Sequence, residues 1–196
     1  MIRNLATALA VLLVACGLAA GSAWWALFHG GPQDVAVGAW RMNSLAGSAQ
    51  AGLYTRARVA VTGLFALNAS ETIYFAAAQD DAGRPLRAAC RYTLTGRSLT
   101  ARWWSITAYA DDFFLIPNAA QRFSYNMGNL AFAPDGSFTL TTGPDPQPGN
   151  WLPTGRQGGR QGGLHLLLRL YNPAPAVLAL PQATPLPSIT PAGDCP

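Results

Sequence analysis

Apolar and polar positions divide the chain into one long uncharged run followed by short alternating segments. Residues 5–28 carry no charged side chain. As a helix rising ~1.5 Å per residue, this run reaches about 36 Å and exceeds the ~30 Å hydrocarbon layer of a bilayer. The apolar part of a signal peptide is only ~7 to 15 residues long. We therefore predict a retained transmembrane anchor over residues 1–29, with Trp24 and Trp25 at the outer interface.

Residues in and before this run predict the orientation of the anchor and offer lipidation as an alternative to a membrane span. Arg3 precedes the run, and positive charge stays cytoplasmic, which places residues 30–196 across the membrane. Residues 13–16 (LVAC) also resemble a lipobox, in which Cys16 would be lipidated. The chain stays apolar after Cys16, so a span is favoured. Gly17 and Gly21 have the G-x-x-x-G spacing of a helix contact in a homodimer.

The region after the anchor changes its periodicity twice. Residues 30–50 are small and weakly patterned, which predicts a tether. Apolar residues then recur at helical spacing and predict one short amphipathic helix over residues 54–67. Beyond it the period falls to two, and turn residues separate short runs rich in aromatic and β-branched side chains. These predict strands at residues 71–78, 88–94, 102–109, 129–133, 138–142 and 164–171.

The last run shows the alternation most clearly. Four leucines occupy the even positions 164–170, while His165, Leu167, Arg169 and Tyr171 occupy the odd ones. Successive side chains of a strand point to opposite faces, so one face is core and the other is free to line a groove. Many short strands joined by long loops predict an antiparallel β sandwich over residues 51–196, ending in a proline-rich tail.

Composition narrows the functional classes. Only 11% of the residues are charged, and the net charge of +4 is too small and scattered for a nucleic-acid surface. All thirteen basic residues are arginine, so P-loop and Schiff-base chemistry, which need lysine, are excluded. We expect no cofactor and no bound metal. The segment at residues 5–28 makes the membrane the first expected partner.

Cysteine positions predict one disulfide. Cys16 lies in the apolar run, which leaves Cys90 and Cys195 as the pair that an oxidising compartment could join. Such a bridge would close a loop of about a hundred residues and hold the proline-rich tail. Two free thiols are the alternative, since spacing alone does not prove connectivity.

Five segments in order resemble one bacterial family. They are WSITAY (104–109), FLIPN (114–118), RFS (122–124), NWLP (150–153) and LRLYNP (168–173). Together they are similar to the domain of unknown function 1214, over roughly residues 70–190. The resemblance implies a jelly-roll-like β sandwich and carries no settled activity. With the anchor, it places the domain on the periplasmic side of the bacterial inner membrane. Residues 111–113 (DDF) stand where the family has an aspartate and a glycine before the aromatic residue, so the turn there is expected to differ.

Polar and aromatic residues in these segments are the candidate ligand-binding residues. A functional interpretation gathers them around one ligand, and a structural interpretation, which we favour, has them cap turns and satisfy loop carbonyls. The candidates are Trp103, Tyr109, Asn118, Arg122, Trp151, Arg169 and Tyr171.

Enzyme signatures are sparse. The chain has no G-x-S-x-G, C-x-x-C or H-E-x-x-H motif. His165 is the one imidazole beyond the membrane edge, and it becomes a catalytic candidate together with Asp111 and Asp112. Residues 80–81 and 111–112 pair carboxylates, which suit Ca²⁺ or glycosidase chemistry but more often form solvated turns.

The sequence thus predicts an envelope protein without a specific activity. The leading hypothesis is a membrane-anchored periplasmic β sandwich that acts as a binding or accessory module for a glycan, a lipid or an envelope protein. The alternative is an envelope hydrolase of glycans or esters that uses His165 and nearby aspartates. A tandem GRQG repeat at residues 155–162 is either a duplicated loop tip or a contact of Arg156 and Arg160 with anionic headgroups.

Overall fold

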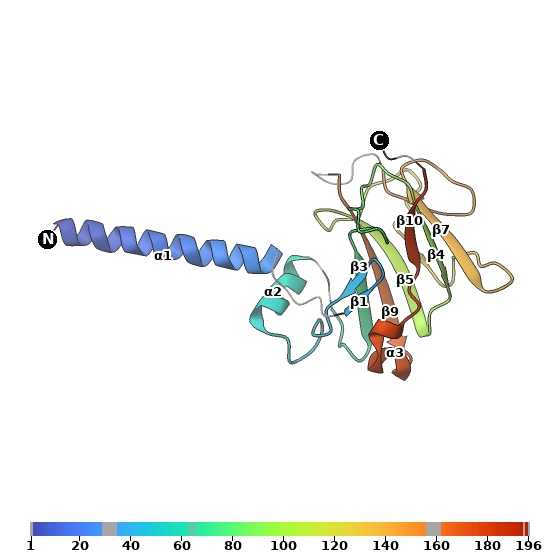
Figure 1. The fold of residues 1–196 in the computed structure, drawn as a ribbon, viewed down its shortest axis with the longest axis horizontal. Coiled ribbons are helices and arrows are strands. Elements are labelled where there is room, and N and C mark those ends of the chain that lie inside the picture. Colours follow the sequence, from blue (N-terminus) through green and yellow to red (C-terminus); the bar gives the residue numbers. More distant parts are fainter. Residues whose placement is uncertain are drawn as a thin grey trace.

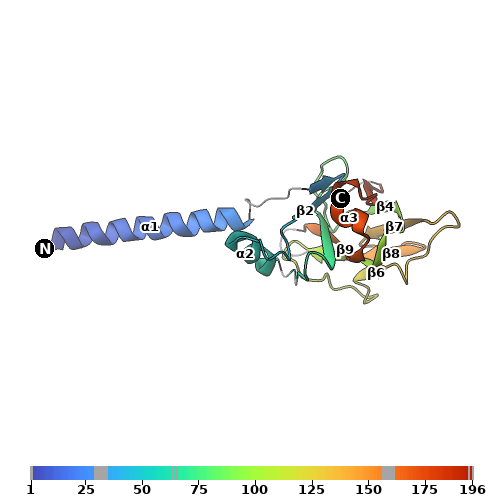
Figure 2. The same cartoon turned by 90° about the horizontal axis from the view of Figure 1, so that it is seen from below.

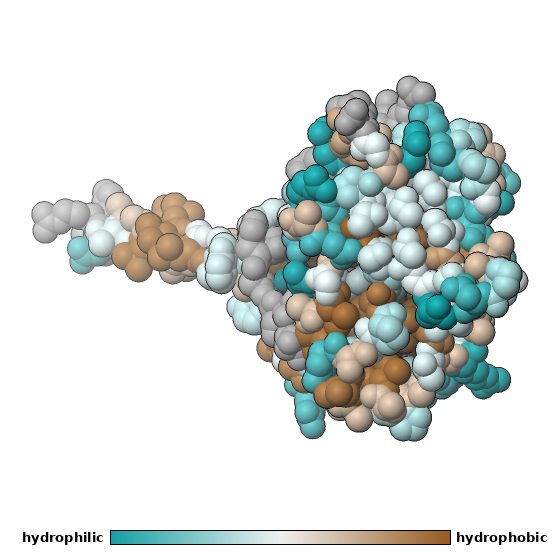
Figure 3. Space-filling model, turned by 45° about the vertical axis from the view of Figure 1, so that its right-hand side comes forward, coloured by the Kyte–Doolittle hydropathy of each residue, from teal (hydrophilic) through white to brown (hydrophobic). Residues whose placement is uncertain are grey.

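The chain forms a long apolar helix that leads to a β-rich head (Figures 1 and 2). The structure is a computed structural model and describes residues 2–28, 35–62, 64, 66–155, 162–193 and 195. Helix α1 (Ile2–Phe28) contains a 24-residue segment that is long and apolar enough to cross a membrane. None of that segment is buried, and its apolar side chains stand clear of the head (Figure 3). The homodimer contact through Gly17 and Gly21 stays a prediction.

The described part of the head is built from two β-sheets. The larger sheet has the order β1-β2-β3-β9-β5-β6 and the smaller has the order β10-β4-β7-β8. The strands of the larger sheet are β1 (Val35–Val37), β2 (Trp40–Met42), β3 (Thr72–Ala77), β9 (Leu164–Pro173), β5 (Ala101–Ala110) and β6 (Ser124–Asn126). Those of the smaller sheet are β10 (Ser188–Pro191), β4 (Tyr92–Arg97), β7 (Ser137–Gly143) and β8 (Asn150–Pro153). The predicted mainly β fold is therefore confirmed.

One core fills the space between the two sheets. The even leucines of β9 are fully buried, as the alternation predicts. Trp104 of β5 lies against Phe138 of β7 with ring centroids 5.6 Å apart, so the inner faces of both sheets are in contact. Burial of such large side chains is the main favourable term in folding. Pairing between the described strands is antiparallel, as expected, except between β7 and β8, which are parallel and make the smaller sheet mixed.

Several predicted boundaries are corrected by local turns. Helix α2 (Leu53–Val61) ends at Val61, six residues before the predicted end, and Thr62 caps it. Strand β4 begins at Tyr92 because residues 87–90 form a turn, closed by the Cys90 amide on the carbonyl of Arg87 (3.1 Å). No strand forms at residues 129–133, which lie in turns and loops. The strands expected at residues 71–78, 102–109, 138–142 and 164–171 are confirmed as β3, β5, β7 and β9.

The expected tether is wrong over residues 35–42, which form β1 and β2. Trp40 is 1% exposed, and its indole N–H donates to the carbonyl of Pro187 (2.7 Å). The Asp81 carboxylate accepts the amides of Ala39 (3.2 Å) and Ile189 (2.7 Å). A large buried indole outweighs the flexibility of the small residues around it. Residues 29–34 lie outside the described residues.

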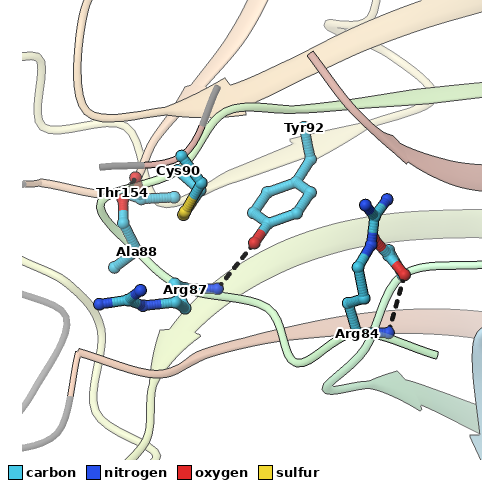
Figure 4. Close-up of a disulfide and its surroundings, with 8 residues drawn as sticks. Arg84, Arg87, Ala88, Cys90, Tyr92 and Thr154 are labelled. Carbon is cyan, nitrogen blue, oxygen red and sulfur yellow. Dashed lines mark hydrogen bonds and ion pairs between the residues drawn. A yellow bond between two sulfur atoms is a disulfide. The ribbon is translucent and has the colours of Figure 1, made fainter. Parts of the chain in front are cut away.

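A disulfide and one strand hold the proline-rich tail. Cys90 and Cys195 are bonded, with Cα atoms 4.8 Å apart, so the predicted pairing is confirmed. Figure 4 shows Cys90 near Tyr92, whose hydroxyl accepts the Arg87 amide (2.9 Å). Strand β10 of the tail pairs with β4. The tail also contains the short helix α3 (Pro175–Ala179) and the turn η1 (Pro181–Ala183), because proline is tolerated at the first position of a helix.

Candidate functional site

A cleft of about 410 Å³ lies between α2 and the outer face of the larger sheet. Its floor comes from outward-facing positions of β3, β9 and β5, and α2 forms one wall. The residues that line it on the sheet and its loops are Ala39, Arg41, Met42, Asn43, Ala46, Tyr74, Ala76, Ala78, Gln79, Tyr109, Phe113, His165, Leu166, Leu167 and Arg169. Those from α2 and the segment after it are Thr55, Arg58, Val59, Thr62 and Leu64.

Strand register explains why these side chains meet. His165 is paired with Tyr109 of β5, and Arg169 is paired with Tyr74 of β3. Directly opposed residues on neighbouring strands project to the same face with Cβ atoms about 4.5 to 5.5 Å apart. The odd positions of β9 therefore fall between the aromatic residues of its two neighbours.

Arg169 is fixed in the floor of the cleft. Its Nη2 donates to the hydroxyl of Tyr109 (2.7 Å), and its Nη1 donates to the hydroxyl of Thr107 (3.1 Å). The guanidinium carbon also lies 5.6 Å from the centroid of the Tyr109 ring. A guanidinium has five N–H donors, so donors remain for a ligand after these two bonds. Arg169 is half-buried, and its charge is consequently less screened than that of a surface arginine.

His165 lies at the other end of the floor, against an aromatic ring. The centroids of His165 and Phe113 are 5.0 Å apart. Burial lowers the pKa of His165 below its ordinary value of 6.5, and the charge of Asp111 opposes this only in part. The imidazole is therefore neutral near pH 7 and offers one donor and one acceptor.

The turn after β5 places Phe113 against the cleft, and a difference from the family pattern there stays a prediction. Phe113 has a φ of 64°, a left-handed conformation that bulky residues rarely adopt. The carboxylate of Asp112 accepts the Phe114 amide (3.1 Å), and the Phe113 amide donates to the carbonyl of Ala110 (3.0 Å). A glycine would adopt this φ without strain, whereas for Phe113 it costs about 1 to 3 kcal/mol.

The candidate residues fall into three groups. Tyr109 and Arg169 line the cleft. Trp103 and Tyr171 lie on the same face of the sheet, beyond the cleft, with ring centroids 5.1 Å apart. The remaining three residues form a separate loop cluster: Asn118, Arg122 and Trp151.

Hydrogen bonds within this loop cluster are structural. Asn118 accepts the amide of Arg122 (3.1 Å) and donates to its carbonyl (3.0 Å). Arg122 donates to the hydroxyl of Tyr125 (3.1 Å) and to the carbonyl of Trp151 (3.3 Å). The Trp151 indole donates to the carbonyl of Gly143 (3.0 Å). The structural interpretation therefore accounts for these three residues.

Paired carboxylates serve turns in the described structure. Oδ1 of Asp80 accepts the amides of Ala82 and Arg84, both at 2.9 Å, and Oδ2 binds the Arg84 side chain. Burial raises the pKa of Asp80, but the bonds and charge of Arg84 outweigh it and lower that pKa overall. Among the described residues, no group of three or more histidine, cysteine, aspartate and glutamate side chains could hold a metal ion. Arg156 and Arg160 lie outside the described residues.

Hydrolase chemistry would need a nucleophile beside His165. Among the residues that the structure describes, no hydroxyl or thiol is hydrogen-bonded to its imidazole. Two of the hydroxyl groups that line the cleft have other partners, since that of Thr62 donates to carbonyls of α2 and that of Tyr109, the residue paired with His165, accepts from Arg169. A nucleophile activated by a base requires that contact.

Sequence reasoning predicted a helix near α2 but did not place it at a site. It also missed two sheet residues that line the cleft, Arg41 and Tyr74. A signal was present for α2, because Thr55, Arg58 and Thr62 recur at spacings of three and four. Such a polar stripe on a helix of a small domain indicates a face turned to something other than core. Nothing marked Arg41 as a site residue, because residues 30–50 were interpreted as a tether.

Comparisons with known proteins give a family and a fold. No curated protein matches the chain. A crystal structure of the VPA0106 protein from Vibrio parahaemolyticus is similar, with a TM-score of 0.58 and 19% identity, over 74% of this chain and 36% of that one. A putative uncharacterized protein from Burkholderia cenocepacia gives a TM-score of 0.43 and 20% identity, over 62% and 29%.

The Vibrio protein is much longer than this chain, which spans about a third of it, and at 19% identity the likeness shows the fold alone. The family model for the protein of unknown function DUF1214 matches residues 71–175, more than half of the chain. This matched region contains β3 to β9 and the floor of the cleft. The chain belongs to the DUF1214 family of proteins of unknown function.

Proposed function

We propose that this protein is a membrane-anchored binding module whose ligand site is the cleft between α2 and the larger sheet. The head faces the periplasmic side of the bacterial inner membrane, and the ligand combines an apolar body with an acidic group. The chemistry of the cleft lining is the observation that carries the proposal.

The lining is apolar with a positive centre. Three arginines, Arg41, Arg58 and Arg169, line the cleft together with His165, and none of the described lining residues is acidic. Alanine, valine, leucine, methionine and aromatic side chains supply most of the remaining wall. A largely apolar cleft of about 300 to 1,000 Å³ with a few fixed polar groups is the usual form of a small-molecule site. An arginine held over an aromatic ring suits a carboxylate or phosphate.

The lining favours a lipid-like ligand over a glycan. Sugars are bound through many hydrogen bonds and stacked aromatic faces, whereas the apolar wall here would leave most hydroxyl groups unsatisfied. The Trp103 and Tyr171 pair lies on the same sheet face but outside the cleft, so it adds no stacking platform to this site.

Binding of a fluorescent polyene fatty acid tests the ligand class. The full chain is placed in nanodiscs of zwitterionic lipid, and probe emission is compared with that of empty nanodiscs. We expect saturable excess emission for the acid and at least a tenfold weaker response for the alcohol of the same chain length, since one charge-assisted bond contributes about 1.5 to 3 kcal/mol. Equal binding of acid and alcohol, or none of either, overturns the proposal.

Arg122 provides a matched control for Arg169. Each guanidinium lies over a tyrosine ring and donates a hydrogen bond to the hydroxyl of the same tyrosine. The partner of Arg169 is Tyr109, and the partner of Arg122 is Tyr125. We expect Arg169→Met to abolish preference for the acid and Arg122→Met to leave it unchanged. If both variants lose binding equally, the effect is one of folding and the cleft assignment fails.

The topology has its own test. Alkaline phosphatase fused after the C-terminal residue is active only outside the cytoplasm. Activity in intact cells is expected because Arg3 lies on the cytoplasmic side of the apolar run. A fusion that accumulates but is inactive in intact cells contradicts the orientation, whatever the cleft binds.

A further inference from the structure

We propose that the outward face of α2 is a membrane-docking surface that lies in the outer leaflet interface, at the mouth of the cleft. The occupant is the lipid bilayer itself. This inference rests on the proposed membrane span of α1, and it concerns the side of α2 that faces away from the ligand.

The two sides of α2 differ in chemistry. Thr55, Arg58, Val59 and Thr62 turn toward the cleft. Leu53, Tyr54 and Val61 are 86%, 58% and 50% exposed. Spacings of seven and eight residues put these three on one side of a helix, and Ala57 lies between Leu53 and Val61 at a spacing of four.

This exposure is costly for a short helix in water. None of the residues of α2 is buried, and an isolated nine-residue helix is below the ~12 to 15 residues needed for even marginal stability. Apolar side chains gathered on one exposed face mark a contact with a partner or a membrane. Insertion of the apolar face into the headgroup and acyl boundary is how interfacial helices are stabilised.

The position of α2 identifies the bilayer as the occupant. Figures 1 and 2 both place α2 beside the C-terminal end of α1, and the two helices are in contact. A span of 24 helical residues is about 36 Å long against ~30 Å of hydrocarbon, so its last turns with Trp24 and Trp25 lie at the interface. Because α2 lies beside those turns, it is held at interfacial depth.

Charge agrees with this placement. Helix α2 contains the exposed Arg56, which does not line the cleft, and no acidic residue, while Arg58 turns toward the cleft. Basic side chains on an interfacial helix are attracted to anionic headgroups, and a tyrosine such as Tyr54 is suited to the interface. The Arg56 side chain also donates to the carbonyls of Ala49 and Ala51, which ties it to the segment before the helix.

Spin labels on the full chain in nanodiscs measure the depth of α2. Cys16→Ala removes the free thiol, and nitroxides are attached at Leu53→Cys or Val61→Cys with the native disulfide kept oxidised. Ser98→Cys, in the exposed turn between β4 and β5, is the matched water control. The nanodiscs contain phosphatidylcholine and phosphatidylglycerol.

Apolar oxygen concentrates in bilayers and a polar nickel chelate concentrates in water, so the two relaxing agents report depth. We expect oxygen to relax the labels at residues 53 and 61 more than nickel does, and the reverse order at residue 98. Nickel-dominated relaxation at both α2 positions overturns the inference. Protection from both agents with dipolar broadening overturns it in favour of a second copy of the chain. If the C-terminal phosphatase fusion is active but the labels on α2 report water, the docking inference alone is rejected. The proposed ligand site is not affected, because neither measurement involves the cleft ligand.

Discussion

The two faces of strand β9 show how one segment builds both core and site. Its even positions carry four leucines that are fully buried between the sheets. Its odd positions carry His165, Leu167, Arg169 and Tyr171, which are partly exposed on the outer face. Residues that are adjacent in the chain therefore lie in opposite environments.

This difference separates stability from recognition. Leucine on the inner face contributes by volume and burial, which any well-fitting apolar residue would approximate. On the outer face, Arg169 and His165 contribute by particular donors, charges and ring contacts. Substitutions on the two faces should therefore have different signatures, and the following predictions test that separation.

Loss of the disulfide should have the largest effect and should act on both faces. The bridge joins cysteines 105 residues apart, for which the chain-entropy model gives about 4 to 5 kcal/mol. We expect Cys90→Ala with Cys195→Ala to lower the free energy of unfolding by about that amount, measured by urea unfolding of the full chain in mild detergent. Cys16→Ala is the control and should change nothing. If acid binding is lost while the free energy of unfolding is unchanged, the two faces do not belong to one cooperative unit.

A leucine on the inner face should come next. Leu168→Ala should lower the free energy of unfolding by about 2 to 5 kcal/mol, because it removes buried volume and leaves a cavity. Leu167→Ala, on the outer face, should cost about 1 kcal/mol or less, since that side chain is only partly buried and faces the cleft. Equal losses in the same urea experiment would break the comparison of the two faces.

The inner face was predictable from sequence because alternation alone decides it. Leucines at every second position of residues 164–170 can bury only on one side of a strand, and the structure agrees. The Cys90–Cys195 bridge was predictable by elimination. The parallel pairing of β7 with β8, the next strand in the chain, was not, because strand direction and register depend on tertiary contacts that no local pattern encodes.

The outer face was predictable only in part. Tyr109, Arg169 and His165 were named from the sequence, but separating them from Asn118, Arg122 and Trp151 required knowledge of which segments meet. Strand β2 was missed because its neighbours are small, although Trp40 was a signal that those residues reach the core. The α2 wall depends on how a helix packs on a sheet, which follows from tertiary structure.

Removal of one hydroxyl on the outer face should have a small effect on stability and a selective one on binding. Tyr109→Phe deletes the acceptor of Arg169 Nη2 but keeps the ring that the guanidinium covers. We expect the free energy of unfolding to fall by about 1 kcal/mol and acid binding to weaken severalfold. Tyr125→Phe deletes the acceptor of both Arg122 and the Trp151 amide, so it should cost at least as much stability but leave binding unchanged. Weakened binding in both variants would mean that the outer-face signature is not local to the cleft.

The pH dependence of stability should show the smallest effect. The pKa of His165 is lowered in the folded protein because burial disfavours the imidazolium. The unfolded chain therefore binds a proton more readily than the native one below about pH 6.5, and stability falls as the pH decreases from 6.5 toward the folded pKa. For one group the slope cannot exceed about 1.4 kcal/mol per pH unit.

Two variants on the outer face isolate this contribution in urea unfolding between pH 5 and 8. His165→Phe should remove it and flatten the profile relative to the native chain. Asp111→Asn should steepen it, since the Asp111 charge opposes the lowering of the His165 pKa and its loss leaves burial unopposed. Leu168→Ala should shift the whole profile down without changing its slope, because the inner face carries no titrating group. A changed slope in the leucine variant would show that the two faces of β9 are energetically coupled through the strand.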